Sequence, residues 1–335
     1  MSPQEKRDVG GASFMLAGDM LRAVVPVYPP EGCSFVRSGS LAGEPSPKVP
    51  EEESVFFKNF DLDGDGRISF EEYMLFVTLL SIPPEDIEVA FKILDADNSG
   101  KIDAGEFSRL LGALQGQAGA QKATTRHLDH TQSGERAGLL RKFFGNDGQK
   151  QLTLDAFEAF MDALREELVR LEYQYYDCQS KGYMTGRDFA HSIVGSASAR
   201  FLDEYLNKVQ AMPVELADAH ITLQELGAFR EVLRQLRALL VALEFIQNSS
   251  RTVTEADLHW VAEHILHTKL TKAQVDIVFY LFGSKEHGLN PRYMHKVLSR
   301  HPATGLRIVY EYQAGQADSG KKSLLDCIRE CHSSL

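Results

Sequence analysis

The sequence predicts an all-α protein made of tandem helix–loop–helix units. Two loops of twelve residues, 61–72 and 95–106, place oxygen-bearing side chains at positions 1, 3, 5, 9 and 12. The frame of these loops recurs downstream, where the loop starts are 32 to 37 residues apart except for one gap of 50. Between the loops, apolar residues follow the i, i+3, i+4, i+7 spacing of an amphipathic helix, as from Ile87 to Leu94.

The two loops carry the full ligand set of a calcium-binding EF-hand. Ca2+ is a hard cation that takes about six to eight oxygen ligands, and a short loop delivers them only if it turns sharply at position 6. Gly66 and Gly100 occupy that position. The predicted ligands are Asp61, Asp63, Asp65, Ser69 (through water) and Glu72 with the carbonyl of Arg67, then Asp95, Asp97, Ser99, Asp103 and Glu106 with the carbonyl of Lys101. Mg2+ could fill both loops in resting cells.

EF-hand units are expected to pair, because a single unit leaves a hydrophobic face uncovered. A short β bridge then joins position 8 of one loop to position 8 of the next. The two oxygen-rich loops start 34 residues apart, with Ile68 and Ile102 at position 8. We therefore expect them to pair with each other in one calcium-binding lobe, residues 51–114.

Five downstream loops keep this frame but lack the oxygens. Lys181 stands at position 5 of the loop 177–188, where it would repel Ca2+. Ala156 replaces the position-12 carboxylate of the loop 145–156. The other degenerate loops are 214–225, 246–257 and 283–293. A further partial unit is expected near Phe14, at the front of the chain.

This reading divides the chain into six parts. They are an N-terminal segment with a partial EF-like unit (1–50), the calcium-binding pair (51–114), a flexible linker (115–138), degenerate EF-hand units (139–230), a degenerate C-terminal lobe (231–300) and a tail with a C-terminal helix (301–335).

Composition excludes several classes of function. A net charge of −11 argues against a nucleic-acid partner, which would need a basic surface. No apolar run approaches the ~18 residues of a membrane-spanning helix, and no targeting peptide is visible at the N-terminus. The four cysteines form no CxxC pair. No catalytic motif is present, so we expect no enzyme.

At this point the chain resembles the mitochondrial calcium uptake family, the EF-hand regulators of the mitochondrial calcium uniporter, in its plant and algal branch. The resemblance spans nearly the whole chain. It rests on the segments 19–30, 56–60, 72–83, 89–95, 143–147, 168–173 and 275–282.

The resemblance implies a calcium sensor at the inner mitochondrial membrane, on the side of the intermembrane space, that gates the uniporter pore subunit. It also implies peripheral membrane contact and a homo- or heterodimer with a sister EF-hand subunit, linked through Cys327 or Cys331. Animal members place a second working site in the last loop, where this chain has Gly283, Lys285 and His287. Here the loop 95–106 takes that role.

An alternative from another class is a soluble calmodulin-like sensor or buffer acting on cytosolic targets. Such proteins use Met-rich grooves, and this chain has 8 Met in 335 residues. A regulatory part of an enzyme would need a catalytic domain, for which the repeats leave no room.

Overall fold

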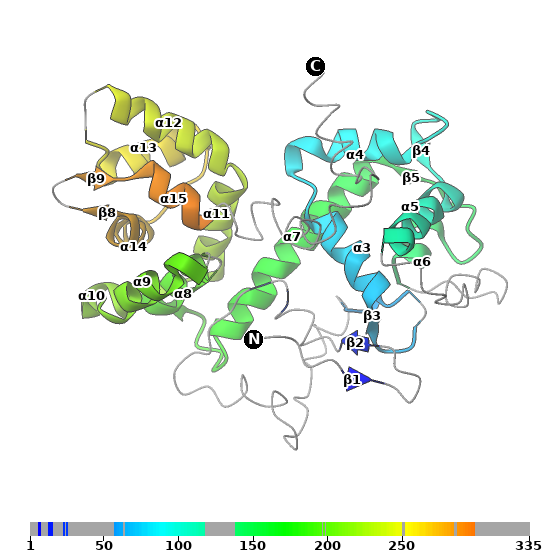
Figure 1. Ribbon diagram of the computed structural model, residues 1–335, viewed down its shortest axis with the longest axis horizontal. Coiled ribbons are helices and arrows are strands. Elements are labelled where there is room, and N and C mark those ends of the chain that lie inside the picture. The colour runs from blue at the N-terminus through cyan, green and yellow to red at the C-terminus, as the bar shows by residue number, and fades with distance from the viewer. Residues whose placement is uncertain are drawn as a thin grey trace. The chain divides into compact units, whose positions relative to one another are not determined.

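The computed structural model describes residues 6–7, 13–15, 23, 25, 57–62, 64–117, 138–195, 197, 199–249, 252–284 and 287–298. These residues form a mostly helical protein, which confirms the predicted fold class (Figure 1). The helices are α3 (Phe70–Leu80), η1 (Pro84–Asp86), α4 (Ile87–Leu94), α5 (Ala104–Gln117), α6 (Gly138–Phe144), α7 (Leu154–Tyr176), α8 (Gly186–Val194), α9 (Ala199–Gln210), α10 (Val214–Ala217), α11 (Leu223–Arg234), α12 (Leu236–Asn248), α13 (Glu255–His264), α14 (Lys272–Phe282) and α15 (Pro291–Leu298).

Short strands occur at position 8 of the loops, as predicted. The strands are β1 (Lys6–Arg7), β2 (Ser13–Met15), β3 (Ile68–Ser69), β4 (Lys101–Ile102), β5 (Leu152–Thr153), β6 (Met184–Thr185), β7 (His220–Ile221), β8 (Gly283–Ser284) and β9 (Gly288–Leu289). Val253, at position 8 of the loop 246–257, has no strand, but its carbonyl accepts a hydrogen bond from the Leu289 N–H at 2.9 Å.

The expected pairing of the two oxygen-rich loops with each other is wrong. Strand β3 of the first loop pairs with β2, with Met15 opposite Ile68. Strand β4 of the second loop pairs with β5, with Ile102 opposite Leu152 (Figure 1). The first loop pairs with a strand near the front of the chain, so the second loop pairs with the next loop downstream. The lobe 51–114 is therefore not a self-contained pair.

The described residues divide into two compact units, and the boundary lies inside α7, between Leu164 and Arg165. Unit 1 takes in the described residues up to Leu164 except Val25, and unit 2 takes in Val25 and the residues from Arg165 onward. The predicted domain boundaries near residues 138 and 230 do not coincide with this division.

Unit 1 has an aromatic core that holds the helices around the two loops. Phe60 lies 4.7 Å from Phe76 between ring centroids, in edge-to-face geometry. Phe143 meets Phe107 at 5.8 Å and Phe160 at 4.8 Å. Such pairs contribute roughly 0.5–1.5 kcal/mol beyond the burial of their area. The exit helices of the two loops, α3 and α5, also pack against each other.

Unit 2 has its own apolar core, which runs from Tyr173 on α7 to Leu298 on α15. Two of its loops begin later than the sequence predicted. Residues Val214–Ala217 form the short helix α10, and α12 continues to Asn248. The first residues of these degenerate loops, Val214 and Ile246, are not metal ligands, so helical backbone there costs no ion site.

Parts of several predictions lie outside the described residues. The expected linker 115–138 begins with the last turn of α5 and ends at the start of α6, and residues 118–137 between them are not described. The tail 301–335, with Cys327 and Cys331, is also outside. Cys178 is described and is disulfide-bonded.

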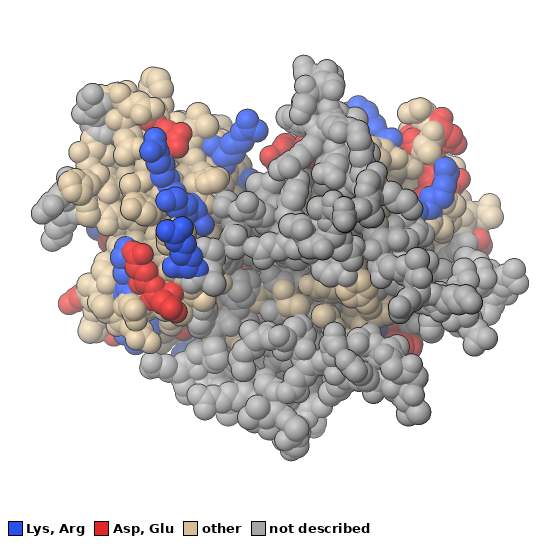
Figure 2. Space-filling model, in the orientation of Figure 1, with Lys and Arg blue, Asp and Glu red and all other residues tan. Residues whose placement is uncertain are grey.

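Charge is unevenly distributed over the surface. Figure 2 shows Lys and Arg side chains in a stripe over unit 2, in the region of α15. The exposed residues of that helix are Arg292, Tyr293, His295 and Lys296. In the part of the chain that the structure describes, no helix is long and apolar enough to cross a membrane.

Candidate metal centres

Asp61, at position 1 of the first loop, is buried and fixes the turn of that loop. Its Oδ1 accepts hydrogen bonds from the N–H groups of Gly64 (2.7 Å) and Asp65 (3.1 Å), and its Oδ2 accepts one from Gly66 (2.9 Å). Gly66 has φ of 77°, in the left-handed region that only glycine adopts at little cost. These three hydrogen bonds hold the Asp61 carboxylate inside the loop without the help of a cation.

Glu72, at position 12 of the same loop, joins the two ends of the loop. Its Oε1 accepts from the Leu62 N–H at 2.6 Å, and its Oε2 accepts from the Ser69 N–H at 2.8 Å and the Ser69 hydroxyl at 2.9 Å. The Glu72 N–H donates back to Ser69 Oγ at 3.3 Å, which completes a capping box at the start of α3. Positions 9 and 12 therefore start the exit helix as well as facing the site.

The second loop repeats this arrangement. Asp95 Oδ1 accepts from the Ser99 N–H at 2.9 Å, and Asp95 Oδ2 accepts from the Gly100 N–H at 2.8 Å. Gly100 has φ of 78°. Ser99 Oγ donates to the Lys101 carbonyl at 2.8 Å, so the oxygens of positions 5 and 7 lie side by side.

Glu106 is at position 12 of the second loop, as Glu72 is in the first. Its Oε1 accepts from the Ala96 N–H at 2.9 Å, and its Oε2 accepts from the Asp103 N–H at 3.1 Å. The Glu106 N–H donates to Asp103 Oδ1 at 2.8 Å. Arg109, one turn further along α5, lies with Nη2 3.7 Å from Glu106 Oε1. The i, i+3 spacing of these two residues could have predicted that contact.

Three carboxylates of the second loop are close enough to share an ion. Oxygens of Asp95, Asp97 and Glu106 all lie within 4.8 Å of one another. The pKa of Asp97 is lowered, first by hydrogen bonds from the hydroxyl and N–H of Ser99 and further by Asp95 and Arg109. A donor set of carboxylate, hydroxyl and carbonyl oxygens fits a hard cation such as Ca2+.

Among the described residues, the structure brings three of the predicted carboxylate ligands together, and all three belong to the second loop. Asp65 Oδ1 accepts from the Arg67 N–H at 2.8 Å, which orders positions 5 and 7 of the first loop. Asp63 lies outside the described residues. The ligand roles themselves, including those of the Arg67 and Lys101 carbonyls, stay predictions.

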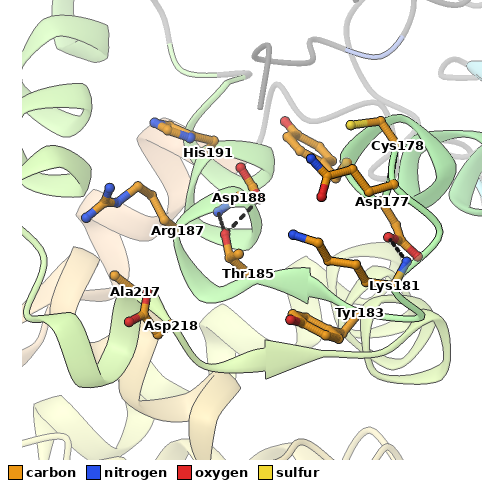
Figure 3. A pocket seen from close by; sticks show the side chains of 12 residues that line it. Asp177, Cys178, Lys181, Tyr183, Thr185, Arg187, Asp188, His191, Ala217 and Asp218 are labelled. Carbon is orange, nitrogen blue, oxygen red and sulfur yellow. Dashed lines mark hydrogen bonds between the residues drawn. The ribbon is translucent and has the colours of Figure 1, made fainter. Parts of the chain in front are cut away.

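The degenerate loop 177–188 keeps the backbone of a working loop around a different centre. Asp177 Oδ1 accepts from the Lys181 N–H at 2.7 Å, and Asp177 Oδ2 accepts from the Gly182 N–H at 2.8 Å, as Asp95 does in the second loop. Asp177 and Lys181 line a cavity of about 200 Å3. Figure 3 shows the Lys181 side chain lying in that cavity, with its amino end directed toward Thr185 and Asp188. The positive charge of this ammonium group would repel a metal ion in the cavity.

One buried polar cluster in unit 2 was not anticipated. Arg230 on α11 is 2% exposed and binds Glu172 on α7 through Nε (3.0 Å) and Nη2 (2.6 Å). Its Nη2 also donates to Ser192 Oγ on α8 at 3.1 Å. The partners are 58 and 38 residues away in sequence, so no local pattern could have indicated the cluster.

Comparison with known proteins supports the EF-hand assignment. A family model described as EF hand matches residues 53–77 and 87–111. The chain is 37% identical over 285 residues to the calcium uptake protein, mitochondrial, of Arabidopsis thaliana, which covers 83% of this chain and 57% of that protein. It is 25% identical over 293 residues to the human calcium uptake protein 1, mitochondrial, covering 82% of this chain and 59% of that protein. The chain therefore spans less than two thirds of the length of these relatives.

Solved structures are similar in fold. The apo structure of the mitochondrial calcium uniporter protein MICU2 has a TM-score of 0.63, over 99% of this chain and 94% of that chain, at 20% identity. The apo structure of EFHA2 has a TM-score of 0.59, over 90% and 95%, at 21% identity. At these identities the likeness supports the arrangement of helices and not a shared ligand.

Proposed function

Because the chain belongs to the mitochondrial calcium uptake family, we propose that it is a calcium-sensing regulatory subunit that gates calcium uptake through the mitochondrial calcium uniporter. The observation that carries the proposal is the contrast between its loops. The loops 61–72 and 95–106 keep the complete ligand pattern, whereas the five downstream loops keep only the frame. Calcium is then read at one end of a larger EF-hand scaffold.

The proposed cofactor is Ca2+ at two sites, with Mg2+ as the occupant at rest. A sensor needs affinity of roughly 10⁻⁷–10⁻⁵ M, the usual range for regulatory EF-hands. Each ion would draw both oxygens of its position-12 glutamate into the site. These oxygens would then leave the N–H groups that they accept from, such as those of Leu62 and Ala96. That exchange changes the entry to α3 or α5 and so biases one of two conformations.

The partners that we propose are the pore subunit of the uniporter and a sister EF-hand subunit, with Cys327 or Cys331 as the link between subunits. The proposed location is the inner mitochondrial membrane, on the intermembrane-space side, with peripheral contact. No catalytic activity is part of the proposal.

The test is calcium flux through the reconstituted uniporter pore subunit in vesicles, with and without the full chain. The chain should suppress flux at low calcium and release it at high calcium. The double variant Glu72→Gln/Glu106→Gln should suppress flux at both concentrations, because it cannot read calcium. Gln keeps an oxygen for the capping box, so the fold is retained.

Two outcomes of this experiment would overturn the proposal. One is flux that the chain does not alter at any calcium concentration. The other is a chain that ignores the channel and instead binds amphipathic target helices in the presence of calcium, as a calmodulin-like sensor does.

A further inference from the structure

The two calcium loops belong to different EF-hand pairs, and each pair contains only one complete loop. The loop 61–72 is bridged to Ser13–Met15. The loop 95–106 is bridged to the loop 145–156. That partner has Gly145 at position 1, Lys150 at position 6 and Ala156 at position 12, so it offers too few oxygens for an ion.

This pairing removes the usual route of coupling between two EF-hand sites. Where two complete loops share a β bridge, ordering of one loop by calcium lowers the entropy cost of ordering the other, and the sites bind cooperatively. Here each bridge joins a calcium loop to a partner that takes no ion. The two sites remain connected along the chain from α3 through η1 to α4, and by the packing of α3 on α5.

The two bridges also lead to different parts of the chain. Strand β5 ends at Thr153, and α7 begins at the next residue, Leu154. Movement of β4 in the second loop is therefore passed directly to the first turn of a helix of 23 residues. The first loop is instead bridged to β2, which continues the sheet to β1.

The far end of α7 is fixed firmly in unit 2. Glu172 on this helix is 3% exposed and is held by two hydrogen bonds from Arg230, which also contacts Ser192 on α8. A bidentate arginine–carboxylate pair out of water is costly to break, since either partner alone would be a buried unpaired charge. Both ends of α7 are thus held, one by the strand bridge to a calcium loop and the other by Arg230 on α11, which also binds Ser192 on α8.

We propose that the two loops are independent calcium sensors with separate outputs. The loop 61–72 acts on the N-terminal strands, and the loop 95–106 acts through β5 and α7 on unit 2. This inference deepens the proposed function, on which its meaning for channel gating rests. One regulator would then respond to the calcium concentration in two separate ways, one through each EF-hand pair.

Independence is tested by calorimetric titration of calcium into the full chain and into the single variants Glu72→Gln and Glu106→Gln. Each variant should retain one site, with a Kd within about twofold of that site in the unchanged chain. A change of about fivefold or more in the remaining site, the lower limit of ordinary allosteric coupling, would overturn independence.

Separate outputs are tested by hydrogen–deuterium exchange of the same two variants with and without calcium. In Glu72→Gln, calcium should alter exchange in residues 152–176 and leave residues 13–15 unchanged. In Glu106→Gln the pattern should be the reverse. Identical patterns in both variants, or no change in residues 152–176 for Glu72→Gln, would contradict the proposal.

Both tests use the purified chain without a channel. A chain that passes them but fails to alter uniporter flux would refute the proposed function and leave the separate outputs standing. A chain that regulates flux but binds calcium cooperatively would support the proposed function and refute the independence of the two loops.

Discussion

The carboxylate at position 12 has two tasks in these loops. In the first loop Glu72 caps α3 together with Ser69, and the same box recurs with Thr222 and Glu225 at α11 and with Thr254 and Asp257 at α13. The later loops have lost their other ligands but still need a start for the exit helix. Helix capping therefore explains why acidic residues persist at position 12 where no metal can bind.

We expect the charge of Lys181 to keep its loop from binding calcium. The substitution Lys181→Asp should create a weak third site, because Asp177, Thr185 and Asp188 already surround the cavity. We expect a Kd of about 10⁻⁴–10⁻³ M, since Asp at position 12 and Gln179 at position 3 are poor replacements for the usual ligands. Calorimetry at millimolar calcium measures it.

The matched control is Lys181→Met, which removes the charge without adding a ligand and should bind no third ion. A Lys181→Asp protein that binds no more calcium than this control would show that the loop has lost more than its position-5 oxygen.

Arg230 contributes to the stability of unit 2 through its pairing with Glu172. Replacing it alone, by Arg230→Met, should lower the free energy of unfolding by about 3–5 kcal/mol, because Glu172 is left charged and buried. The double variant Glu172→Leu/Arg230→Met should recover most of that loss, since a well-packed apolar pair carries no desolvation penalty. Denaturant unfolding of both variants checks this, and equal destabilisation of the two would refute the explanation.

At the scale of elements, the helices and position-8 strands were predictable and their pairing was not. Helix α7 was expected from its apolar stripe between Phe157 and Leu171, and the structure confirms it. The pairing was missed because a 34-residue period fits either neighbour equally well. The choice depends on the few residues of β2, whose pattern at the front of the chain is too short to identify a full unit.

The same limit applies to the sites. The ligand positions within each loop could be predicted from spacing, because a twelve-residue loop fixes its own geometry, and the ligand roles stay predictions. The contact of Glu172 with Arg230 could not, because it depends on how α7, α8 and α11 pack.

The stiffness of α7 can be tested at Glu166, an exposed residue near its middle. Glu166→Gly should destabilise the helix by about 1 kcal/mol, while Glu166→Ala removes the same side chain and keeps helix propensity. We expect the glycine variant, and not the alanine variant, to reduce the calcium-dependent change in exchange at Ser192 and its neighbours. Calcium affinity should be unchanged in both. Equal signals in the two variants would show that α7 does not carry the change.

At the scale of the whole molecule, the chain combines two complete loops with a scaffold of units that cannot bind metal. Unit 1 contains both complete loops and unit 2 contains none. Unit 2 has instead a well-packed core and an exposed face on α15 with Arg292 and Lys296. In the proposed regulator, unit 1 would bind calcium and unit 2 would offer a surface to a partner.

We propose that the loops 61–72 and 95–106 are the sites at which this chain binds regulatory calcium. Calorimetric titration of the full chain beside the double variant Glu72→Gln/Glu106→Gln tests it most directly. The unchanged chain should bind two ions with high affinity and the double variant none, with unchanged helical content. Two high-affinity sites remaining in the double variant would contradict it.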